Sequence, residues 1–185
     1  MIVVLLGASG SGKSTIENIL SKDFGYDKIV SYTTRKQRLG ETNGKDYHFI
    51  DNDTFKEALR KGLFAEYDEY SQERFYGTLK SDYKKGNIVV VLTPNGLRQL
   101  KRSCSDEDIF AVYVDANLGT RVKRYVDRCG VNKFNFDDKN EIAARVERDF
   151  GAFMGVKDEV DMVVDNSEGS NIGDIADEVM LYCGL

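Results

Sequence analysis

The stretch Gly7-Ala8-Ser9-Gly10-Ser11-Gly12-Lys13-Ser14-Thr15 follows directly on the apolar run Ile2–Leu6. It fits the phosphate-loop pattern G-x-x-x-x-G-K-[ST] in full, between an expected buried strand and an expected helix. Its glycines let backbone N–H groups approach a polyphosphate without a Cβ atom in the way. Lys13 supplies a charge for the β and γ phosphates, Ser14 a hydroxyl for Mg²⁺, and the helix its positive N-terminal end. We therefore expect the chain to bind a nucleoside triphosphate with Mg²⁺.

Composition excludes several classes of protein. The 185 residues carry a formal net charge of −5, which argues against a general affinity for nucleic acid or for an anionic membrane. Three cysteines without C-x-x-C spacing indicate neither a disulfide framework nor a zinc site. Met1 enters the first strand directly, and no apolar run approaches the roughly 18 residues of a bilayer span. We expect a cytoplasmic protein, either a monomer or a homodimer.

Apolar runs alternate with amphipathic segments along the whole chain. After the phosphate loop we expect strands at 26–31, 46–50, 87–92, 109–114 and 160–165, and helices at about 53–61, 95–102, 117–129, 139–154 and 172–183. Polar loops are expected at 33–45 and 130–138. Helix 139–154 should pack through apolar residues that include Phe150. This order predicts an α/β fold with a mostly parallel five-stranded sheet flanked by helices, which binds ligands at the carboxyl ends of its strands.

Short motifs in a fixed order resemble guanylate kinases, which move the γ-phosphoryl of ATP to GMP. They are Ser31–Arg35, Arg38–Glu41, Gly44–Phe49, Phe64–Glu66, Phe75–Thr78, the arginines at 124, 128 and 145, and Val163–Asn166. The resemblance implies one guanylate-kinase-like domain. Its phosphate-loop kinase core comprises 1–31, 81–120 and 155–185, an inserted region for the nucleoside monophosphate comprises 32–80, and a helical lid comprises 121–154.

The resemblance also implies a role for individual residues. The acceptor GMP or dGMP would be held by Ser31, Arg35, Arg38, Tyr47, Glu66, Tyr76, Gly77, Thr78 and Thr93. Of these, Glu66 and Thr78 would address the guanine base. ATP would bind to residues 7–15 and Asn166, Mg²⁺ to Ser14, and catalysis would fall to Lys13, Arg124, Arg128 and Arg145. Planar arginine forks suit phosphate oxygens, and a carboxylate accepts from both N1–H and the amine of guanine, a donor pair that adenine lacks.

The chain departs from the family's pattern in three places. Val91 and Thr93 stand where the family usually has two aspartates, one of which helps to read the guanine amine. We therefore expect looser acceptor selectivity and a higher Mg²⁺ requirement, rather than inactivity. The loop between the lid arginines is longer than usual at 132–138. The family's acid after the last lid arginine is replaced around Asp149 and Phe150.

Two classes of function remain open. One is an ATP-dependent nucleoside monophosphate kinase, with GMP or another monophosphate as acceptor. The other is a binding module similar to the guanylate-kinase-like domains of scaffold proteins, which grip phosphopeptides without catalysis. Those domains typically lose the phosphate loop, whereas this chain keeps it, so the sequence favours the enzyme.

Overall fold

The computed structural model describes residues 1–184, except Leu39, Gln72, Lys84, Lys85, Asp106 and 131–135. Its main sheet has five strands: β1 (Ile2–Leu6), β2 (Asp27–Lys28), β7 (Ile88–Val91), β8 (Ile109–Asp115) and β9 (Met162–Asp165). Their order is β2-β7-β1-β8-β9, and every neighbouring pair is parallel. The expected five-stranded parallel sheet is therefore confirmed.

The central strand β1 is buried on both faces. Val3 and Leu5 pack with helices α1 (Lys13–Asp23) and α6 (Ile172–Tyr182), and Ile2, Val4 and Leu6 pack with α3 (Pro94–Ser103) on the other side. Successive side chains of a strand point to opposite faces, so a run of apolar residues without alternation is what a covered parallel strand requires. The carboxyl end of β1 leads directly into the phosphate loop, which therefore lies at the ligand-binding edge of the sheet.

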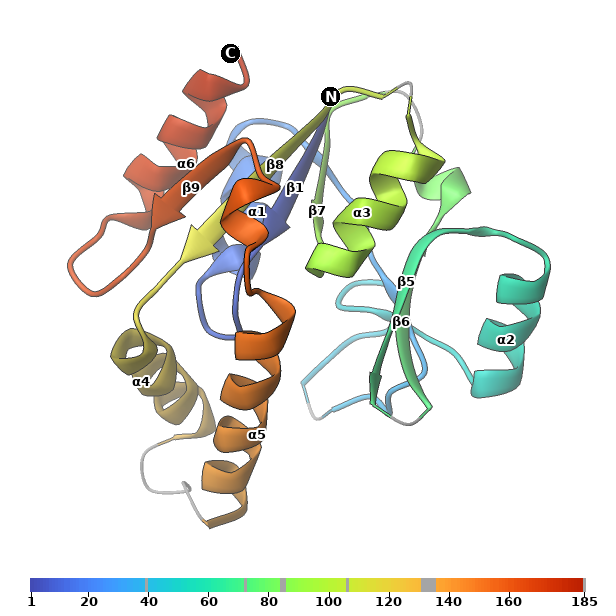
Figure 1. Cartoon of the computed structure of the whole chain (residues 1–185), viewed down its shortest axis with the longest axis horizontal. Coiled ribbons are helices and arrows are strands. Elements are labelled where there is room, and N and C mark those ends of the chain that lie inside the picture. The colour runs from blue at the N-terminus through green and yellow to red at the C-terminus, as the bar shows by residue number, and fades with distance from the viewer. Residues whose placement is uncertain (39, 72, 84–85, 106, 131–135, 185) are drawn as a thin grey trace.

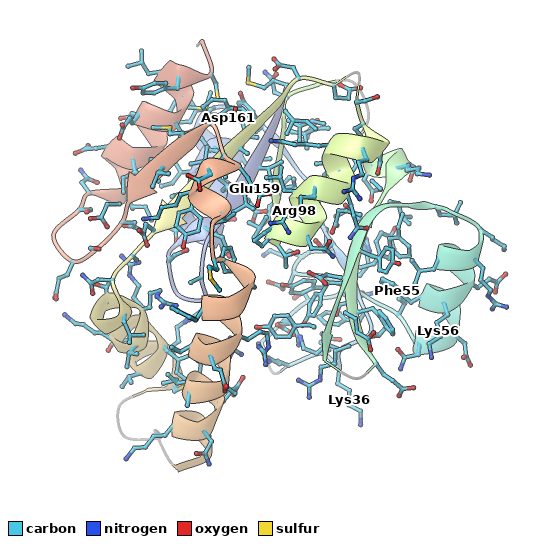
Figure 2. All side chains as sticks on the ribbon, in the orientation of Figure 1. Lys36, Phe55, Lys56, Arg98, Glu159 and Asp161 are labelled. Atoms are coloured by element: carbon cyan, nitrogen blue, oxygen red, sulfur yellow. The ribbon has the colours of Figure 1, made fainter. Side chains whose placement is uncertain are left out.

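A second, four-stranded sheet lies beside the first (Figure 1). Its strands are β3 (Tyr32–Thr33), β4 (His48–Phe49), β5 (Phe64–Ser71) and β6 (Arg74–Leu79), in the order β4-β3-β6-β5 with β5 and β6 as an antiparallel hairpin. Helix α2 (Asn52–Arg60) covers it through the fully buried Phe55, labelled in Figure 2. The Phe55 ring stacks on Phe64 at 4.3 Å and on Phe75 at 5.2 Å. An aromatic stack thus supports this sheet.

Two short strands differ from their expected bounds, and a third forms where no strand was expected. The strand expected at 26–31 shrinks to β2, because after Ile29 donates its N–H to Val89 the chain leaves the main sheet for β3. The strand expected at 46–50 shrinks to β4, which pairs only with the two residues of β3. The expected loop 33–45 loses Thr33 to β3. Pairing between distant segments, rather than local composition, sets all three lengths.

Helices α4 (Leu118–Cys129) and α5 (Phe136–Ala152) extend together away from the main sheet (Figure 1). Helix α5 begins at Phe136, so the loop expected to reach residue 138 ends earlier, while its part at 131–135 lies outside the described residues. Packing by Phe150 was predicted and is wrong, since its side chain is 76% exposed. Helix α5 contacts α4 through Glu141 and Tyr125 and contacts β5 through Arg148 and Tyr70, whereas the exposed Phe150 ring faces solvent.

Two short 3-10 helices, Lys80–Asp82 and Val156–Asp158, complete the described fold. Just after the second, Glu159 forms an ion pair with Arg98 on α3, and both side chains are labelled in Figure 2. This contact attaches the chain that follows α5 to the core. No helix in the described part of the chain combines the length and apolar content of a bilayer span.

Candidate active site

The phosphate loop owes its shape to glycine. Gly7 and Gly12 have φ angles of 148° and 103°, which L side chains rarely adopt. A Cβ atom at Gly7 would lie 2.3 Å from the Val114 carbonyl oxygen, and one at Gly12 would lie 2.2 Å from Nδ2 of Asn166. Both positions therefore exclude any side chain. The loop can present its backbone to a ligand only with glycine at these points.

Lys13 turns its ammonium group back over the loop. Its Nζ donates to the carbonyl oxygens of Gly7 at 2.7 Å and Ala8 at 3.0 Å. Burial lowers the pKa of Lys13 to about 8, against the opposing charge of Asp149. A phosphate placed at this ammonium would favour its charged form and raise that pKa again. Lys13 is therefore held at the loop, where a bound anion would stabilise its charged form.

Asp149 on α5 also reaches the phosphate loop. This buried carboxylate accepts the Ser9 N–H at 2.7 Å and lies 3.4 Å from the Arg121 guanidinium. No role was expected for Asp149, although its position after the last lid arginine marks a departure from the family's pattern. An acidic side chain here occupies one of the loop N–H groups that bind phosphate in this class of loop.

Arg124, which was expected to act in catalysis, and Asn166, which was expected to bind ATP, both contact carbonyl groups of the loop. Arg124 donates to the carbonyl oxygens of Gly10 and Ser11 at 3.1 and 3.2 Å and to that of Asn166 at 2.9 Å. Asn166 donates its own Nδ2 to the Ser11 carbonyl oxygen at 2.8 Å. Arg128 is exposed, and its Nε donates to the Arg124 carbonyl oxygen. In this conformation Arg124 and Asn166 brace the loop.

Arg35 is the most enclosed cation of the acceptor region. Its two Nη atoms bond to both carboxylate oxygens of Glu41 at 2.9 and 2.7 Å, and its Nε donates to the Tyr76 hydroxyl at 3.2 Å. The Tyr47 ring lies 5.3 Å from its guanidinium carbon. Burial by itself would lower the pKa of Arg35, but the hydrogen bonds to Glu41 and Tyr76 have the larger combined effect, so the pKa is raised. A buried, permanently charged fork is therefore present before any phosphate arrives.

Helix α5 approaches this region from the opposite side. Glu141 pairs with Arg145 one turn away at 2.5 Å and lies 3.7 Å from Arg38, across the cleft. Further along the helix, the Arg148 guanidinium carbon lies 4.0 Å from the centre of the Tyr70 ring on β5. These contacts bring helix α5 to the edge of the second sheet.

Glu66 on β5 is a buried carboxylate at the same cleft. Its side chain accepts the Thr78 hydroxyl at 2.8 Å, and a Cβ atom at position 96 would lie 2.8 Å from its other oxygen, so Gly96 leaves space for it. Burial raises the pKa of Glu66 to about 7, with the bonds to Thr78 opposing this and the charge of Asp68 adding to it. A carboxyl group in this state is stabilised by any ligand that donates to it.

One cleft of about 970 Å³ brings most of the expected site together. Its lining includes three phosphate-loop residues, most of the acceptor residues and one lid arginine: Gly7, Ser9, Lys13, Ser31, Arg35, Arg38, Tyr47, Glu66, Tyr76, Gly77, Thr93 and Arg145. Thr78 contacts Glu66 from outside this lining. The rest of the loop, Arg124, Arg128 and Asn166 do not line the cleft. The cleft therefore joins the phosphate loop to a second, arginine-rich site.

Several lining residues escaped the sequence analysis. They include Glu41, Asp68, Tyr70, Glu141, Arg148 and Asp149. For Asp68 and Tyr70 a signal existed, because period-two alternation from Glu66 places both on the same face of a strand. Glu141 gave no comparable signal, since only the tertiary fold brings α5 against the second sheet.

The loop also fits a Mg²⁺ ion carried by a nucleotide. Ser14 is exposed at the start of α1, and its hydroxyl has no bonding partner in the described ranges. Within those ranges, no three His, Cys, Asp or Glu side chains gather to cage a metal. Mg²⁺ commonly takes one or two protein ligands and completes its shell with phosphate oxygens and water. Ser14 therefore fits the protein's share of such a shell.

A phosphate-loop α/β core whose cleft continues onto a second, arginine-rich region is the architecture of the nucleotide kinases of the phosphate-loop class. More narrowly, the chain belongs to the guanylate kinase family, whose family model matches residues 1–179. It is 34% identical over 135 residues to a guanylate kinase of Lactobacillus johnsonii, an alignment that covers 69% of this chain and 65% of that protein, short of two thirds of its length.

Two further comparisons cover more of the chain. A guanylate kinase of Salinibacter ruber is 31% identical over 172 residues, which is 90% of this chain and 88% of that protein. The crystal structure of guanylate kinase from Anaplasma phagocytophilum superposes with a TM-score of 0.70 at 22% identity, covering 100% of this chain and 84% of that one. At that identity the structure supports the fold alone.

Proposed function

We propose that this chain transfers the γ-phosphoryl group of ATP to GMP or dGMP, giving ADP and GDP or dGDP. The observation that carries the proposal is a single cleft with Lys13 of the phosphate loop on one side and the buried carboxyl of Glu66 on the other. A site for a polyphosphate alone needs no buried carboxylate. A site for a guanine nucleotide does.

Base selection follows from the chemistry of Glu66. An ionised carboxylate accepts from guanine N1–H and from the exocyclic amine, and each such bond is worth about 1.5–3 kcal/mol. Adenine presents a lone pair at N1 and a C–H group at C2, so the buried charge of Glu66 stays unpaired. Leaving a buried charged acceptor unpaired is the costly case, which predicts discrimination of roughly tenfold or more.

Transfer requires no nucleophile from the protein. An oxygen of the acceptor's phosphate forms a bond to the γ phosphorus, while the bond from that phosphorus to the bridging oxygen of ADP breaks. Catalysis is positioning plus neutralisation of charge between two anions that repel each other. Arg35 and Arg38 hold the acceptor phosphate, and Lys13 and Arg145 contact the transferring group.

Carboxylates of the chain itself already pair with the arginines among these cations. Glu41 occupies the fork of Arg35, and Glu141 occupies Arg145 and approaches Arg38. Phosphate oxygens accept hydrogen bonds in the same geometry as these carboxylates. A bound phosphate can therefore replace a carboxylate beside each arginine, and the arginine's charge stays neutralised. Helix α5, which bears Arg145 and Glu141, closes over the acceptor and excludes water, which limits hydrolysis of ATP.

We also propose that Mg²⁺ enters with ATP and that Ser14 is its protein ligand. The ion's contribution is to neutralise negative charge on the β and γ phosphates. With no carboxylate at Val91 or Thr93, the nucleotide's own oxygens and water supply the other ligands, and we expect a higher Mg²⁺ requirement than is usual for the family.

The test is a coupled assay of ADP formation with GMP, dGMP, AMP, CMP and UMP, with a reaction lacking acceptor as the control for hydrolysis. We expect ADP formation with GMP and dGMP to exceed that with AMP by roughly tenfold or more. Equal rates with all five acceptors would overturn the assignment of Glu66. No ADP above the control with any of them would overturn the proposal as a whole.

A further inference from the structure

A second carboxylate, Asp68, lies on the cleft face of β5 next to Glu66. The two residues are two positions apart on one strand and pair with Thr78 and Tyr76 across the hairpin, so their side chains leave the same face. Both line the cleft. Glu69, which follows them, is exposed and does not line it. The second sheet therefore presents two adjacent carboxylates, Glu66 and Asp68, to the cleft in which the guanine base would bind.

Thr93 fixes the Asp68 carboxylate. Its hydroxyl donates to Oδ2 of Asp68 at 2.7 Å and accepts the Gly96 N–H at 3.0 Å, as the N-cap of α3. The only proton of this hydroxyl is therefore committed to Asp68. The other oxygen, Oδ1, accepts no hydrogen bond from the residues that the structure describes. Asp68 is thus oriented by one oxygen and open at the other.

Guanine offers one donor beyond the two that Glu66 accepts, because the exocyclic amine has a second N–H group that points away from N1. N1–H and the exocyclic amine present three N–H groups along one edge, while one Glu66 oxygen already accepts from Thr78. The strand end at Val91–Thr93 supplies no carboxylate to this edge. An additional acceptor must come from another element, and β5 places one there.

We propose that Asp68, oriented by Thr93, is a specificity-determining residue that accepts a hydrogen bond from the exocyclic amine of the guanine acceptor. Thr93 then acts as a positioning residue and not as a ligand of the base. This inference rests on the proposed function and deepens it. It reverses the expectation of looser selectivity, because the charge missing from the strand end is supplied by the neighbouring sheet.

The test compares GMP with IMP, which keeps N1–H and lacks the amine. Asp68→Asn preserves an oxygen for the Thr93 hydroxyl and removes the charge. At pH 8, where Glu66 is ionised, we expect kcat/KM for GMP to fall roughly tenfold or more and that for IMP to change little. The GMP to IMP ratio therefore collapses. Glu69→Gln is the matched control, since it removes one charge from the opposite face of the same strand and leaves the ratio unchanged.

Substitutions at Thr93 test the positioning role. Thr93→Val keeps the shape and removes the hydroxyl, so it should lower the GMP to IMP ratio by less than Asp68→Asn does. Thr93→Ser retains the hydroxyl and should restore the ratio. Loss of the helix cap alone would lower stability and affect both acceptors alike.

Two outcomes would overturn the inference. One is a GMP to IMP ratio that Asp68→Asn leaves unchanged, and the other is an equal fall in activity with both acceptors. Either result is distinguishable from failure of the proposed function, which the unsubstituted protein reveals by forming no ADP with GMP.

Discussion

The two ends of the cleft are built in opposite ways. The phosphate loop is one continuous segment whose shape depends on backbone angles at Gly7 and Gly12. The acceptor site instead gathers side chains from Ser31 to Thr93, spread over the second sheet, its loops and the end of β7. Under the proposed function, the phosphate loop binds ATP through N–H groups that local geometry has already aimed. The acceptor site, by contrast, would bind GMP through charged side chains that must exchange their present partners for phosphate.

This difference predicts how substitutions in each half of the cleft affect activity. Substitution in the loop removes a contact that nothing else can replace. Substitution in the acceptor site redistributes charge among Arg35, Glu41, Arg145 and Glu141, which already form pairs without ligand. We therefore expect the largest losses at the phosphate loop and graded, acceptor-dependent losses across the second site.

The largest effect should come from Lys13→Met. Among the described residues the ammonium donates only to loop carbonyls, and it lines the cleft, so its removal should spare the fold. We expect turnover to fall about 100- to 1,000-fold, as for loss of one preorganised donor to the transition state. Turnover with ATP and GMP measures it, and Lys22→Met at the end of α1 is the control. Near-normal turnover would refute the loop's assigned role.

A smaller effect is expected from Arg145→Lys. The substitution keeps the charge and loses the planar fork, so the transferring group loses a bidentate contact. We expect kcat to fall about 10- to 100-fold with little change in KM for GMP. Steady-state kinetics separates the two, with Arg60→Lys on α2 as the control. A raised KM at unchanged kcat would place Arg145 with the acceptor and away from the reaction.

The pH dependence of acceptor use should report Glu66. Below its pKa of about 7 the carboxyl carries a proton and loses an acceptor for guanine. We expect kcat/KM for GMP to fall about tenfold per pH unit below 7, relative to the Glu66→Gln variant, which corrects for titration of GMP itself. A constant ratio of the two profiles between pH 5.5 and 8 would contradict this.

The buried carboxyl of Glu66 should also make the free energy of unfolding fall as the pH rises. Folding raises the pKa of Glu66 from 4.5 to about 7, so between these values the folded protein holds a proton that the unfolded chain has lost. The free energy of unfolding then declines with pH through this window. Glu66→Gln removes that decline, and thermal melts of the two proteins at pH 5 and pH 8 measure the difference.

The smallest effect should come from Phe150→Ser. The ring is 76% exposed, so the free energy of unfolding should change by no more than about 0.5 kcal/mol. The buried Phe55 gives the contrast, since Phe55→Ala should cost about 3–5 kcal/mol and weaken GMP binding by loosening the second sheet. Denaturant unfolding measures both. A cost above 2 kcal/mol at Phe150 would mean that α5 packs on that side.

Local pattern was sufficient for the main sheet and its helices. The unbroken apolar run Ile2–Leu6 and the glycine-rich turn after it predict a buried strand and a phosphate loop, because each depends on residues adjacent in sequence. The second sheet as a whole was not foreseen. A short alternating strand was expected at 46–50, where β4 lies, but β3 and the β5–β6 hairpin were not expected, and the two-residue strands β3 and β4 depend on pairing with distant segments.

The parallel α/β core, the phosphate loop and the family could all be predicted from the sequence, since they depend on short-range periodicity and on glycines at fixed spacing. Three features required the folded structure: the hydrogen bond from Thr93 to Asp68, the contact of Asp149 with Ser9, and the exposure of Phe150. Hydrogen bonds and burial depend on distances between residues far apart in the chain. Those distances are set by sheet pairing and helix direction, which local residue patterns do not encode.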